Sequence, residues 1–209
     1  MTDAASKPAT LLIATRNKGK LAEFKGLLSG VALEFVSPDD LEDVDDVAET
    51  GGTFSENARL KATGYALQTR LHSLADDSGL EVEALGGRPG VLSARYGGEA
   101  TSFGEKITML LDELQKAHDR ERRARFVCSL AIADPAGEII FTADGICDGK
   151  IAFEPRGIGG FGYDPIFIPA GYDETFGELS SAVKQEISHR ASAFRQIIPF
   201  LRGFIAILT

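Results

Sequence analysis

Two adjacent carboxylates, Asp76 and Asp77, follow a short apolar run and precede Ser78 and Gly79. Because aspartate is depleted in strand interiors, the pair predicts that a central strand ends there. Open α/β sheets bind ligands beside the carboxyl ends of their strands, where such carboxylates can hold a metal ion or act in catalysis. The same residues are favoured in a solvated turn. This stretch alone therefore supports a functional site and a plain turn equally.

A second group of polar residues lies between an apolar run and an amphipathic helical pattern. There Thr15, Asn17 and Lys20 bring a hydroxyl, an amide and an ammonium group to one turn. The N–H groups and the dipole of a helix N-terminus favour an anion, so the turn is a candidate phosphate site. An ordinary helix start, capped by Asn17 and carrying solvated lysines, fits the spacing as well.

Two further groups of charged residues are candidates for either a functional site or a solvated surface. Near the C-terminus, Lys184, His189 and Arg190 offer three donors within one or two expected helical turns, or else form a solvated polar helix face. An acidic run over residues 39–49 predicts mostly a solvated, mobile loop. Glu49 ends this run and is its member closest to structured sequence.

Several familiar sites are excluded by spacing. A Walker A loop is absent, because Leu21 follows Gly19-Lys20 and Ala14 stands where the first glycine is needed. Residues 157–162 spell Gly-x-Gly-x-x-Gly, but Tyr-Asp-Pro and an apolar run follow, whereas a dinucleotide-binding fingerprint opens a helix. The two cysteines and three histidines lack zinc-ligand spacing. No Ser-His-Asp arrangement is recognisable.

Composition limits the remaining classes of protein. A formal net charge of −9 argues against a general nucleic-acid-binding surface, although a local lysine cluster or a bound cation can still hold a small anion. No apolar run approaches the ~20 residues of a membrane-spanning helix, and residues 1–9 form a polar leader without a signal-peptide core. Cys128 and Cys147 lie in apolar runs and are expected to be buried free thiols. We expect a cytoplasmic protein that binds neither membranes nor nucleic acid.

The chain alternates strand and helix signals. Strands are expected over residues 10–15 and 31–36 and up to Asp77, with a hairpin over 125–133 and 138–146. Helices are expected after Asn17, from Thr53 to about Arg70, after Ser102, and near the C-terminus. The fold class is therefore α/β, with a mixed sheet flanked by helices. Residues 10–209 are expected to form one elongated, two-lobed domain with a central cleft.

Eight short motifs occur in order along the chain. They are Thr15-x-Asn17-x-x-Lys20, Glu49-Thr50-Gly51, Glu56-Asn57-Ala58-x-x-Lys61, Ala75-Asp76-Asp77-Ser78-Gly79-Leu80, Leu85-Gly86-Gly87-x-Pro89-Gly90, Ser93-Ala94-Arg95-Tyr96, Phe161-Gly162-Tyr163-Asp164-Pro165 and Ser188-His189-Arg190. In this order they resemble the noncanonical purine nucleoside triphosphate pyrophosphatases, the inosine triphosphatase family, over nearly the whole chain. The resemblance implies Mg²⁺-dependent hydrolysis of ITP, dITP and XTP to the monophosphate and pyrophosphate by a homodimer, in the cleft of a two-lobed fold.

The resemblance also implies roles for individual residues. Glu49 and Asp77 resemble the carboxylates that hold Mg²⁺, and Asp77 resembles the proton acceptor for the attacking water. A carboxylate bound to a dication is a weak base, so the alternative is that Asp77 mainly positions a water whose acidity the metal raises. Asp76 then either shares this work or only orients its neighbour.

The substrate-binding residues carried over by the resemblance fall into a phosphate group and a base group. They are Thr15, Asn17, Lys20, Lys61 and Ser78 for phosphate, and Phe161, Gly162, Tyr163, Asp164, Lys184, His189 and Arg190 for the nucleotide and its base. Donors aimed at a 6-keto oxygen would meet the amino group of adenine, and such mispairing can separate substrates by ~10⁴-fold.

Two other classes of function remain open. One is a pyrophosphatase for another modified nucleotide, and the other is a non-catalytic nucleotide-binding module. The order of preference among ITP, dITP and XTP, the number of metal ions and the dimer surface do not follow from the sequence.

Overall fold

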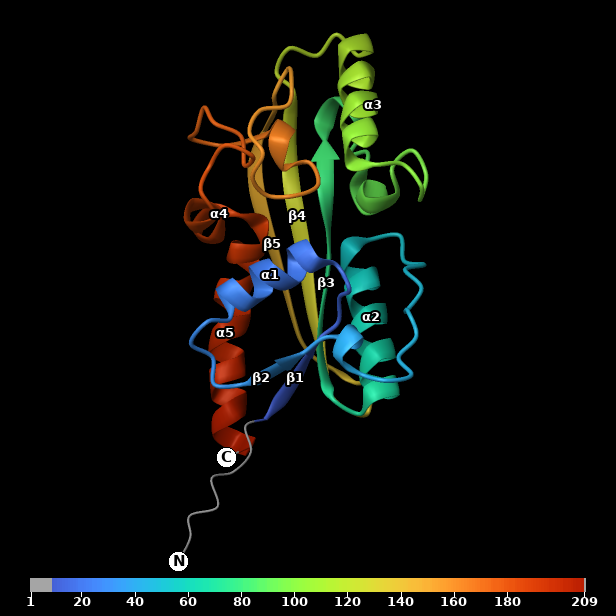
Figure 1. Ribbon diagram of the computed structural model, residues 1–209, viewed down its shortest axis with the longest axis vertical. Helices are drawn as coiled ribbons and strands as arrows, with labels where there is room; N and C mark the ends of the chain where they lie inside the picture. Colours follow the sequence, from blue (N-terminus) through green and yellow to red (C-terminus); the bar gives the residue numbers. More distant parts are fainter. Residues whose placement is uncertain (1–8, 209) are drawn as a thin grey trace, which may run out of the picture.

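The computed structural model describes residues 9–208, which form a six-stranded mixed sheet with helices on both of its faces (Figure 1). The order of the strands is β2-β1-β3-β4-β5-β6. They span Thr10–Ile13 (β1), Glu34–Val36 (β2), His72–Val82 (β3), Arg123–Ala133 (β4), Ile139–Ile151 (β5) and Phe167–Pro169 (β6). β1 runs parallel to β2 and β3, and the other neighbours are antiparallel. The predicted mixed sheet is confirmed.

The helices begin where local capping signals stand in the sequence. They span Lys18–Leu27 (α1), Phe54–Thr69 (α2), Phe103–Lys116 (α3), Ser181–Ile187 (α4) and His189–Leu208 (α5). The side chains of Asn17, Thr53 and Ser102 each accept a hydrogen bond from the backbone N–H three residues later. These caps satisfy N–H groups that have no partner within the helix, which confirms the predicted starts of α1, α2 and α3.

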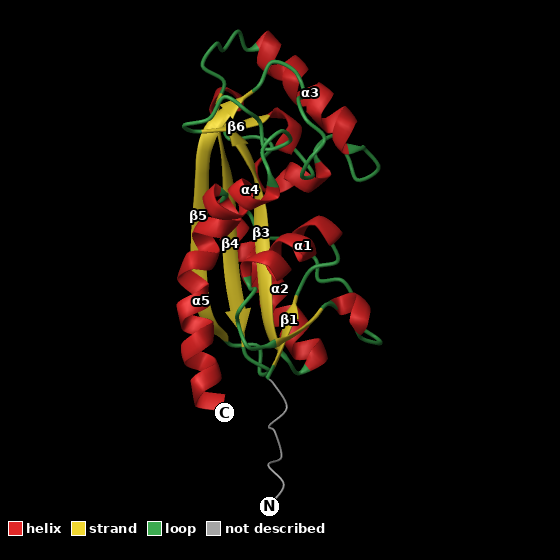
Figure 2. Cartoon of the chain, turned by 60° about the vertical axis from the view of Figure 1, so that its left-hand side comes forward, coloured by secondary structure: helices red, strands yellow, loops and turns green. Residues whose placement is uncertain are grey.

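The three longest strands run through both lobes of the molecule (Figure 2). The lower lobe of Figure 1 contains β1, β2 and α2, and the upper lobe contains α3 together with β6, which Figure 2 labels. In β1, Leu11 and Ile13 point into a core with α1 and α5, whereas Leu12, and Ala14 just after the strand, point into a core with α2. Since successive side chains of a strand face opposite ways, a sheet covered on both faces needs the continuous apolar run found here.

The predicted end of the central strand at Asp77 is wrong. β3 continues to Val82, because β4 pairs with it from Ser73 to Val82 and supplies its backbone hydrogen bonds. On its other edge β3 pairs with β1 only over His72–Leu74, after which β1 turns away toward α1. The carboxylates therefore lie beside the carboxyl end of β1, as expected for an open sheet, but in the middle of β3.

Several other boundaries differ from the prediction. The strand expected over 31–36 is limited to Glu34–Val36, because the backbone N–H groups of Val31 and Leu33 bond within a turn that follows α1. The hairpin is confirmed with longer strands, and the C-terminal helical sequence is divided into α4 and α5 at Ser188.

The remaining sequence-based expectations concern thiols, membranes and the leader. Cys128 and Cys147 are buried and free, as predicted. In the part of the chain that the structure describes, no helix is both long and apolar enough to span a bilayer. The leader expected over residues 1–9 falls, except for Ala9, outside the described residues.

α5 approaches β5 so closely that only glycine fits at their contact. A Cβ atom at Gly145 would lie 2.1 Å from the carbonyl oxygen of His189 and 2.5 Å from the backbone nitrogen of Ala193. Both of these atoms belong to the backbone of α5, so neither can move without shifting the helix. Gly145 thus sets where the first turn of α5, and with it His189, lies against the sheet.

We predict that Gly145→Ala lowers the free energy of unfolding by about 1–3 kcal/mol, the usual cost of overpacking a core. Gly203→Ala is the matched control, because a Cβ atom added at Gly203, which lies in α5, would meet no atom within 4 Å. There the change favours the helix by up to ~1 kcal/mol. Urea unfolding of both variants tests this contact, and equal stability of the two would contradict it.

Candidate active site

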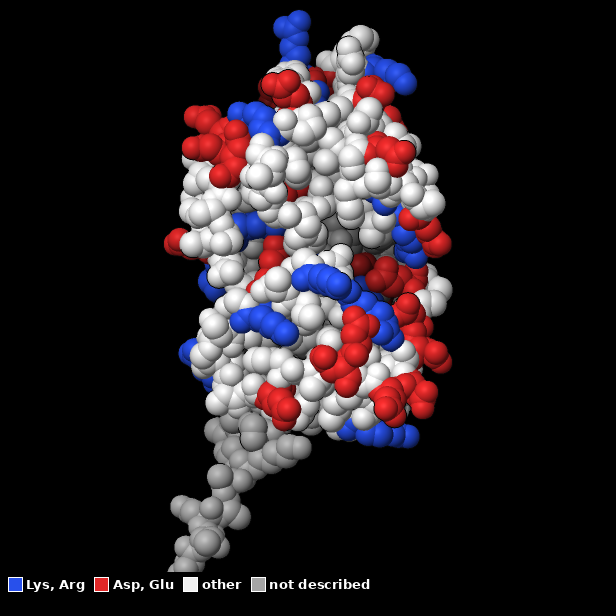
Figure 3. All heavy atoms as spheres, in the orientation of Figure 1, with Lys and Arg blue, Asp and Glu red and all other residues white. Residues whose placement is uncertain are grey.

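A cavity of about 510 Å³ lies between the two lobes, where Figure 3 shows a hollow at mid-height flanked by acidic and basic side chains. Of the residues predicted for the site, those that line it are Thr15, Asn17, Lys20, Glu49, Lys61, Asp77, Ser78, Phe161, Gly162, Tyr163, Asp164, His189 and Arg190. Lys184 lines an adjoining cavity of about 310 Å³ and contacts Asp164. The structure therefore brings the whole predicted set together.

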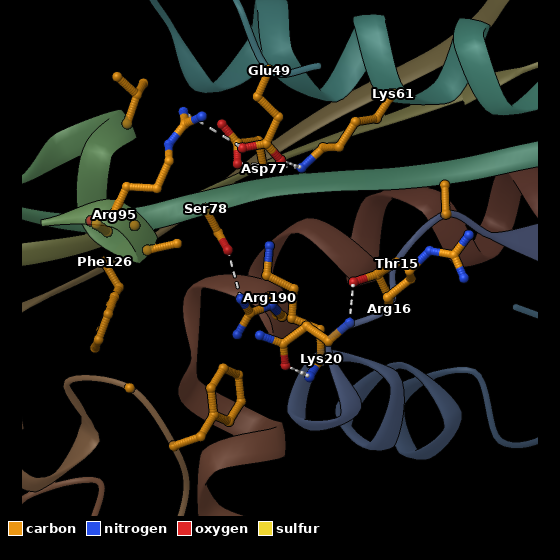
Figure 4. Close-up of a pocket in the computed structure, with 18 of the residues that line it drawn as sticks. Thr15, Arg16, Lys20, Glu49, Lys61, Asp77, Ser78, Arg95, Phe126 and Arg190 are labelled. Carbon is orange, nitrogen blue, oxygen red and sulfur yellow. Dashed lines mark hydrogen bonds and ion pairs between the residues drawn. The ribbon is translucent and has the colours of Figure 1, made fainter. Parts of the chain in front are cut away.

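One face of β3 carries Asp77, which points toward α2 (Figure 4). Asp77 Oδ2 accepts a hydrogen bond of 3.1 Å from Asn57 Nδ2. Lys61 Nζ lies 3.4 Å from Asp77 Oδ1 and 2.5 Å from Glu49 Oε1. The carboxylates of Glu49 and Asp77 come from distant segments, yet they share one ammonium group and are close enough to act on one cation.

The chemistry of this pair fits a hard divalent cation. Carboxylate oxygens are ligands that Mg²⁺ accepts, and Mg²⁺ is usually held by one or two carboxylates together with waters and substrate phosphates. Among residues 9–208, no group of three or more His, Cys, Asp or Glu side chains is placed to hold a metal. Glu49 and Asp77 therefore suit an ion that arrives with phosphate rather than a metal fully enclosed by protein.

The electrostatic surroundings of Asp77 favour proton uptake. Burial raises the pKa of Asp77 above its ordinary value, although the ammonium groups of Lys61 and Lys20 oppose this shift. The pKa of Lys61 is also raised, because Asp77, Asp76 and Glu49 outweigh the cost of its own burial. Lys61 therefore stays charged beside a carboxylate that is a stronger base than usual.

Asp76 points to the opposite face of β3, toward α1 and α5. Lys20 Nζ lies 2.8 Å from Asp76 Oδ1, and Arg190 Nε lies 3.3 Å from Asp76 Oδ2. Burial opposes ionisation, but Lys20, Arg190 and Lys61 hold the pKa of Asp76 well below its usual range. Asp76 is thus a permanently charged anchor for two cations, and its direction does not support a proton-transfer role shared with Asp77.

The turn before α1 is a capped helix start that still has side-chain hydrogen-bond donors without a partner among the described residues. Thr15 Oγ1 accepts a hydrogen bond from the backbone N–H of Asn17, and Asn17 Oδ1 accepts one from the backbone N–H of Lys20. These bonds leave the hydroxyl proton of Thr15 and the amide protons of Asn17 available to an anion. The sequence allowed this turn to be either an ordinary capped helix start or a phosphate site, and the observed geometry is compatible with both at once.

The polar residues near the C-terminus form a buried network instead of a solvated helix face. Lys184 Nζ lies 2.5 Å from Asp164 Oδ2 and 2.7 Å from Glu23 Oε1, and the second oxygen of Glu23 lies 2.8 Å from Arg190 Nη1. Lys184, His189 and Arg190 are all buried. Ser188 is extended and its hydroxyl oxygen caps α5, which places these donors on two helices rather than one.

His189 begins α5 and directly precedes Arg190, a member of this network. Its ring stacks on Phe126 with 4.7 Å between the centroids, and its buried Nδ1 has no hydrogen-bond partner within the described residues. Burial, Arg190 and Lys184 together hold the pKa of His189 well below the ordinary histidine value. A neutral imidazole with an unpaired buried nitrogen is placed to bind a ligand that supplies the missing partner.

Four residues near the cavity were missed by sequence reasoning. Glu23 bridges Lys184 and Arg190, Phe126 supports His189, and Arg95 faces Glu49. Arg16 pairs with Asp39 and Asp46 and donates to a carbonyl oxygen of the acidic run. The run is therefore held against the turn before α1 rather than forming the mobile loop that was predicted. Two of them had a signal in the sequence: Glu23 follows Lys20 by three residues on one helix face, and Arg95 stands in one of the eight ordered motifs, although no role was expected for it.

The chain is similar to known proteins over nearly its whole length. The model of the Ham1 family matches residues 11–200. A dITP/XTP pyrophosphatase of Oceanobacillus iheyensis is 47% identical over 192 residues, covering 91% of this chain and 97% of that relative. One of Rhodospirillum centenum is 48% identical over 190 residues, covering 90% and 93%. The structure of a HAM1 protein from Coxiella burnetii has a TM-score of 0.86 at 40% identity, covering 93% of this chain and 99% of that one.

The buried state of His189 predicts a pH-dependent stability. Since its pKa is lowered in the fold, an unfolded chain binds a proton below about pH 6.5 that the folded chain does not, and stability is lost as the pH falls. The loss from this group is up to about 1.4 kcal/mol per pH unit. We predict that the stability difference between the wild type and His189→Gln shrinks from pH 7.5 to pH 5 in urea unfolding.

The exposed His118 provides the control for this measurement. His118→Asn also removes one imidazole, but an exposed one, and its unfolding is measured over the same pH range. If the curves of the wild type and His189→Gln run parallel over this range, His189 is not held neutral by the fold.

Proposed function

The chain belongs to the Ham1 family, and from this premise we propose that it hydrolyses ITP, dITP and XTP to the nucleoside monophosphate and pyrophosphate. The observation that carries the proposal is the meeting of Glu49 and Asp77 at Lys61 in the cavity. This carboxylate pair lies between a helix start with free donors and a buried polar network, so one cavity offers a reactive centre, a phosphate site and a base site.

The phosphate chain is bound by cations and hydroxyl groups on both sides of β3. Thr15, Asn17 and Lys20 contact it from the start of α1, where the helix dipole adds to the attraction. Ser78, which lines the cavity, and Lys61 complete this set. A protein with a net charge of −9 can therefore bind an anionic substrate, because the charge that matters is local.

Glu49 and Asp77 hold a divalent cation, which we propose to be Mg²⁺. When bound, this ion supplies positive charge against the phosphates and acidity to a water. The residues of the chain supply the rest: Lys61 stays charged beside the carboxylates, and Asp77 orients the attacking water and accepts its proton. Because a carboxylate bound to a dication is a weaker base, it is the acidity that the ion gives to the water that would let Asp77 accept the proton.

The base is recognised by the network around His189. The ring of Phe161 offers an aromatic face for stacking, and Lys184 lies 4.8 Å from the centre of that ring. Lys184, His189 and Arg190 present donors that suit the 6-keto oxygen of hypoxanthine or xanthine. The 6-amino group of adenine would leave them unpaired, at a cost of about 1–3 kcal/mol for each neutral group.

The alternatives differ from this proposal in what they require of the carboxylates. A non-catalytic nucleotide-binding module has no need for two carboxylates at one ammonium group, so the Glu49 and Asp77 pair favours catalysis. A pyrophosphatase for another modified nucleotide would keep the same reactive centre and change the base. We also propose a homodimer, supported by the family resemblance alone and tested by the mass of the protein in solution, and a cytoplasmic location, supported by the two buried free thiols.

We predict that purified protein with Mg²⁺ releases pyrophosphate from ITP, dITP and XTP with kcat/KM about 10⁴-fold above that for ATP. A panel of modified pyrimidine and methylated purine nucleotides is measured in parallel. Equal cleavage of ATP and ITP would contradict the specificity, and a preference for a panel nucleotide would favour the second alternative. Tight binding of ITP without pyrophosphate release would show a binding module.

A further inference from the structure

Arg95 lies near Glu49 and Asp77, the proposed reactive carboxylates, and the proposed function gives it no role. Its side chain lines the same cavity as Lys61 and Asp77, and in Figure 4 its guanidinium points toward Glu49. Arg95 Nη2 lies 3.8 Å from Glu49 Oε2, which is too long for a hydrogen bond. Within residues 9–208 the structure gives this guanidinium no hydrogen bond. An arginine with five N–H donors thus borders the cavity with its donors unused.

The backbone that carries Arg95 is fixed against β3. Arg95 ends the 3₁₀ helix η3 (Gly90–Arg95), and the preceding Ser93 accepts a hydrogen bond from the backbone N–H of Leu80 through its hydroxyl oxygen. A Cβ atom at Gly79 would lie 2.4 Å from Ser93 Oγ and 2.6 Å from the carbonyl oxygen of Gly90. Glycine at position 79 therefore lets η3 lie directly on the strand that carries Asp77.

The hydroxyl groups of two tyrosines also hold this segment. The hydroxyl group of Tyr163 donates to the carbonyl oxygen of Ser93 at 3.0 Å, and that of Tyr96 donates to Glu113 at 2.5 Å. The residues on both sides of Arg95 are thus pinned, whereas its own side chain is half-buried and makes no such bond. A fixed backbone combined with unused hydrogen-bond donors is typical of a residue that is preorganised to bind a ligand.

β3 shows which part of a nucleotide would lie near Arg95. The buried polar network that we propose to bind the base includes Arg190, which pairs with Asp76 on one face of β3. Glu49 and Lys61 lie on the face of Asp77, and Arg95 approaches them there. Cleavage at Asp77 separates a nucleoside monophosphate, whose base lies in the network, from pyrophosphate. The pyrophosphate portion therefore extends past Asp77 toward Lys61 and Arg95.

We infer that Arg95 binds the β- and γ-phosphates of the substrate from the upper lobe, opposite Lys61 of the lower lobe. This inference rests on the proposed function and adds a residue to it. A guanidinium can bind two phosphate oxygens at once, which gives strong, charge-assisted hydrogen bonds. It also offsets part of the negative charge of Glu49 and Asp77, which would otherwise repel a polyphosphate, since among the described residues only Lys61 forms a closer ion pair with these two carboxylates. Negative charge that develops on the departing pyrophosphate is stabilised by the same contact.

The test compares Arg95→Ala and Arg95→Lys with the control Arg125→Ala. Arg125 pairs with Glu81 on the surface away from the cavity, so its loss removes one positive charge without touching the site. Steady-state cleavage of ITP is measured together with the inhibition constants of pyrophosphate and IMP. Binding of pyrophosphate to each protein is measured by calorimetry in the same Mg²⁺ buffer. The melting temperature of each variant checks that it is folded.

We expect Arg95→Ala to lower kcat/KM for ITP about 10²-fold and to weaken pyrophosphate at least 10-fold, with IMP unchanged. Arg95→Lys regains part of the loss, because a lysine keeps the charge but not the paired contact. Unchanged pyrophosphate binding in Arg95→Ala, or equal weakening of IMP and pyrophosphate, would overturn the inference and leave the proposed function intact. A wild type that releases no pyrophosphate from ITP would overturn the proposed function, and the calorimetry would then still decide whether Arg95 binds pyrophosphate.

Discussion

The structure depends on two adjacent carboxylates in the middle of a buried strand. Because successive residues of β3 face opposite ways, Asp76 and Asp77 meet two separate sets of cations. Lys20 and Arg190 approach Asp76, and Lys61 approaches Asp77. Buried charges are tolerated only when they are paired and hydrogen-bonded, so each face of the strand must supply its own cations. The start of α1, the start of α5 and the inner face of α2 are placed to do this.

The division of labour between the two carboxylates follows from this arrangement. Asp76 is surrounded by cations and keeps its charge, whereas burial raises the pKa of Asp77. Asp76 thus pairs with Lys20 and Arg190, whereas Asp77 is the carboxylate that we propose to act together with Glu49. In this proposal one strand holds a structural and a reactive carboxylate, and the cavity between the lobes is lined by groups from both faces of the strand.

The sequence predicts those features that depend on local contacts. The caps at Asn17, Thr53 and Ser102 depend on neighbours in the chain, and the structure confirms them. The length of β3 was not predictable, because its continuation depends on pairing with β4, about 50 residues later in the chain. The position of Arg95 depends on the packing of η3 against Gly79, which leaves no periodic signal. The ordered motifs predicted most of the other residues of the site, but they did not predict how these residues are arranged in space.

The most direct test of this account compares Asp76→Asn with Asp77→Asn in urea unfolding and in ITP hydrolysis. We predict that Asp77→Asn stays about as stable as the wild type and loses at least ~10³-fold in kcat. Asp76→Asn is predicted to lose about 3–5 kcal/mol of stability, because two buried cations lose their partner. Near-normal turnover in a folded Asp77→Asn protein, or full stability of Asp76→Asn, would contradict the separation of the two roles across β3.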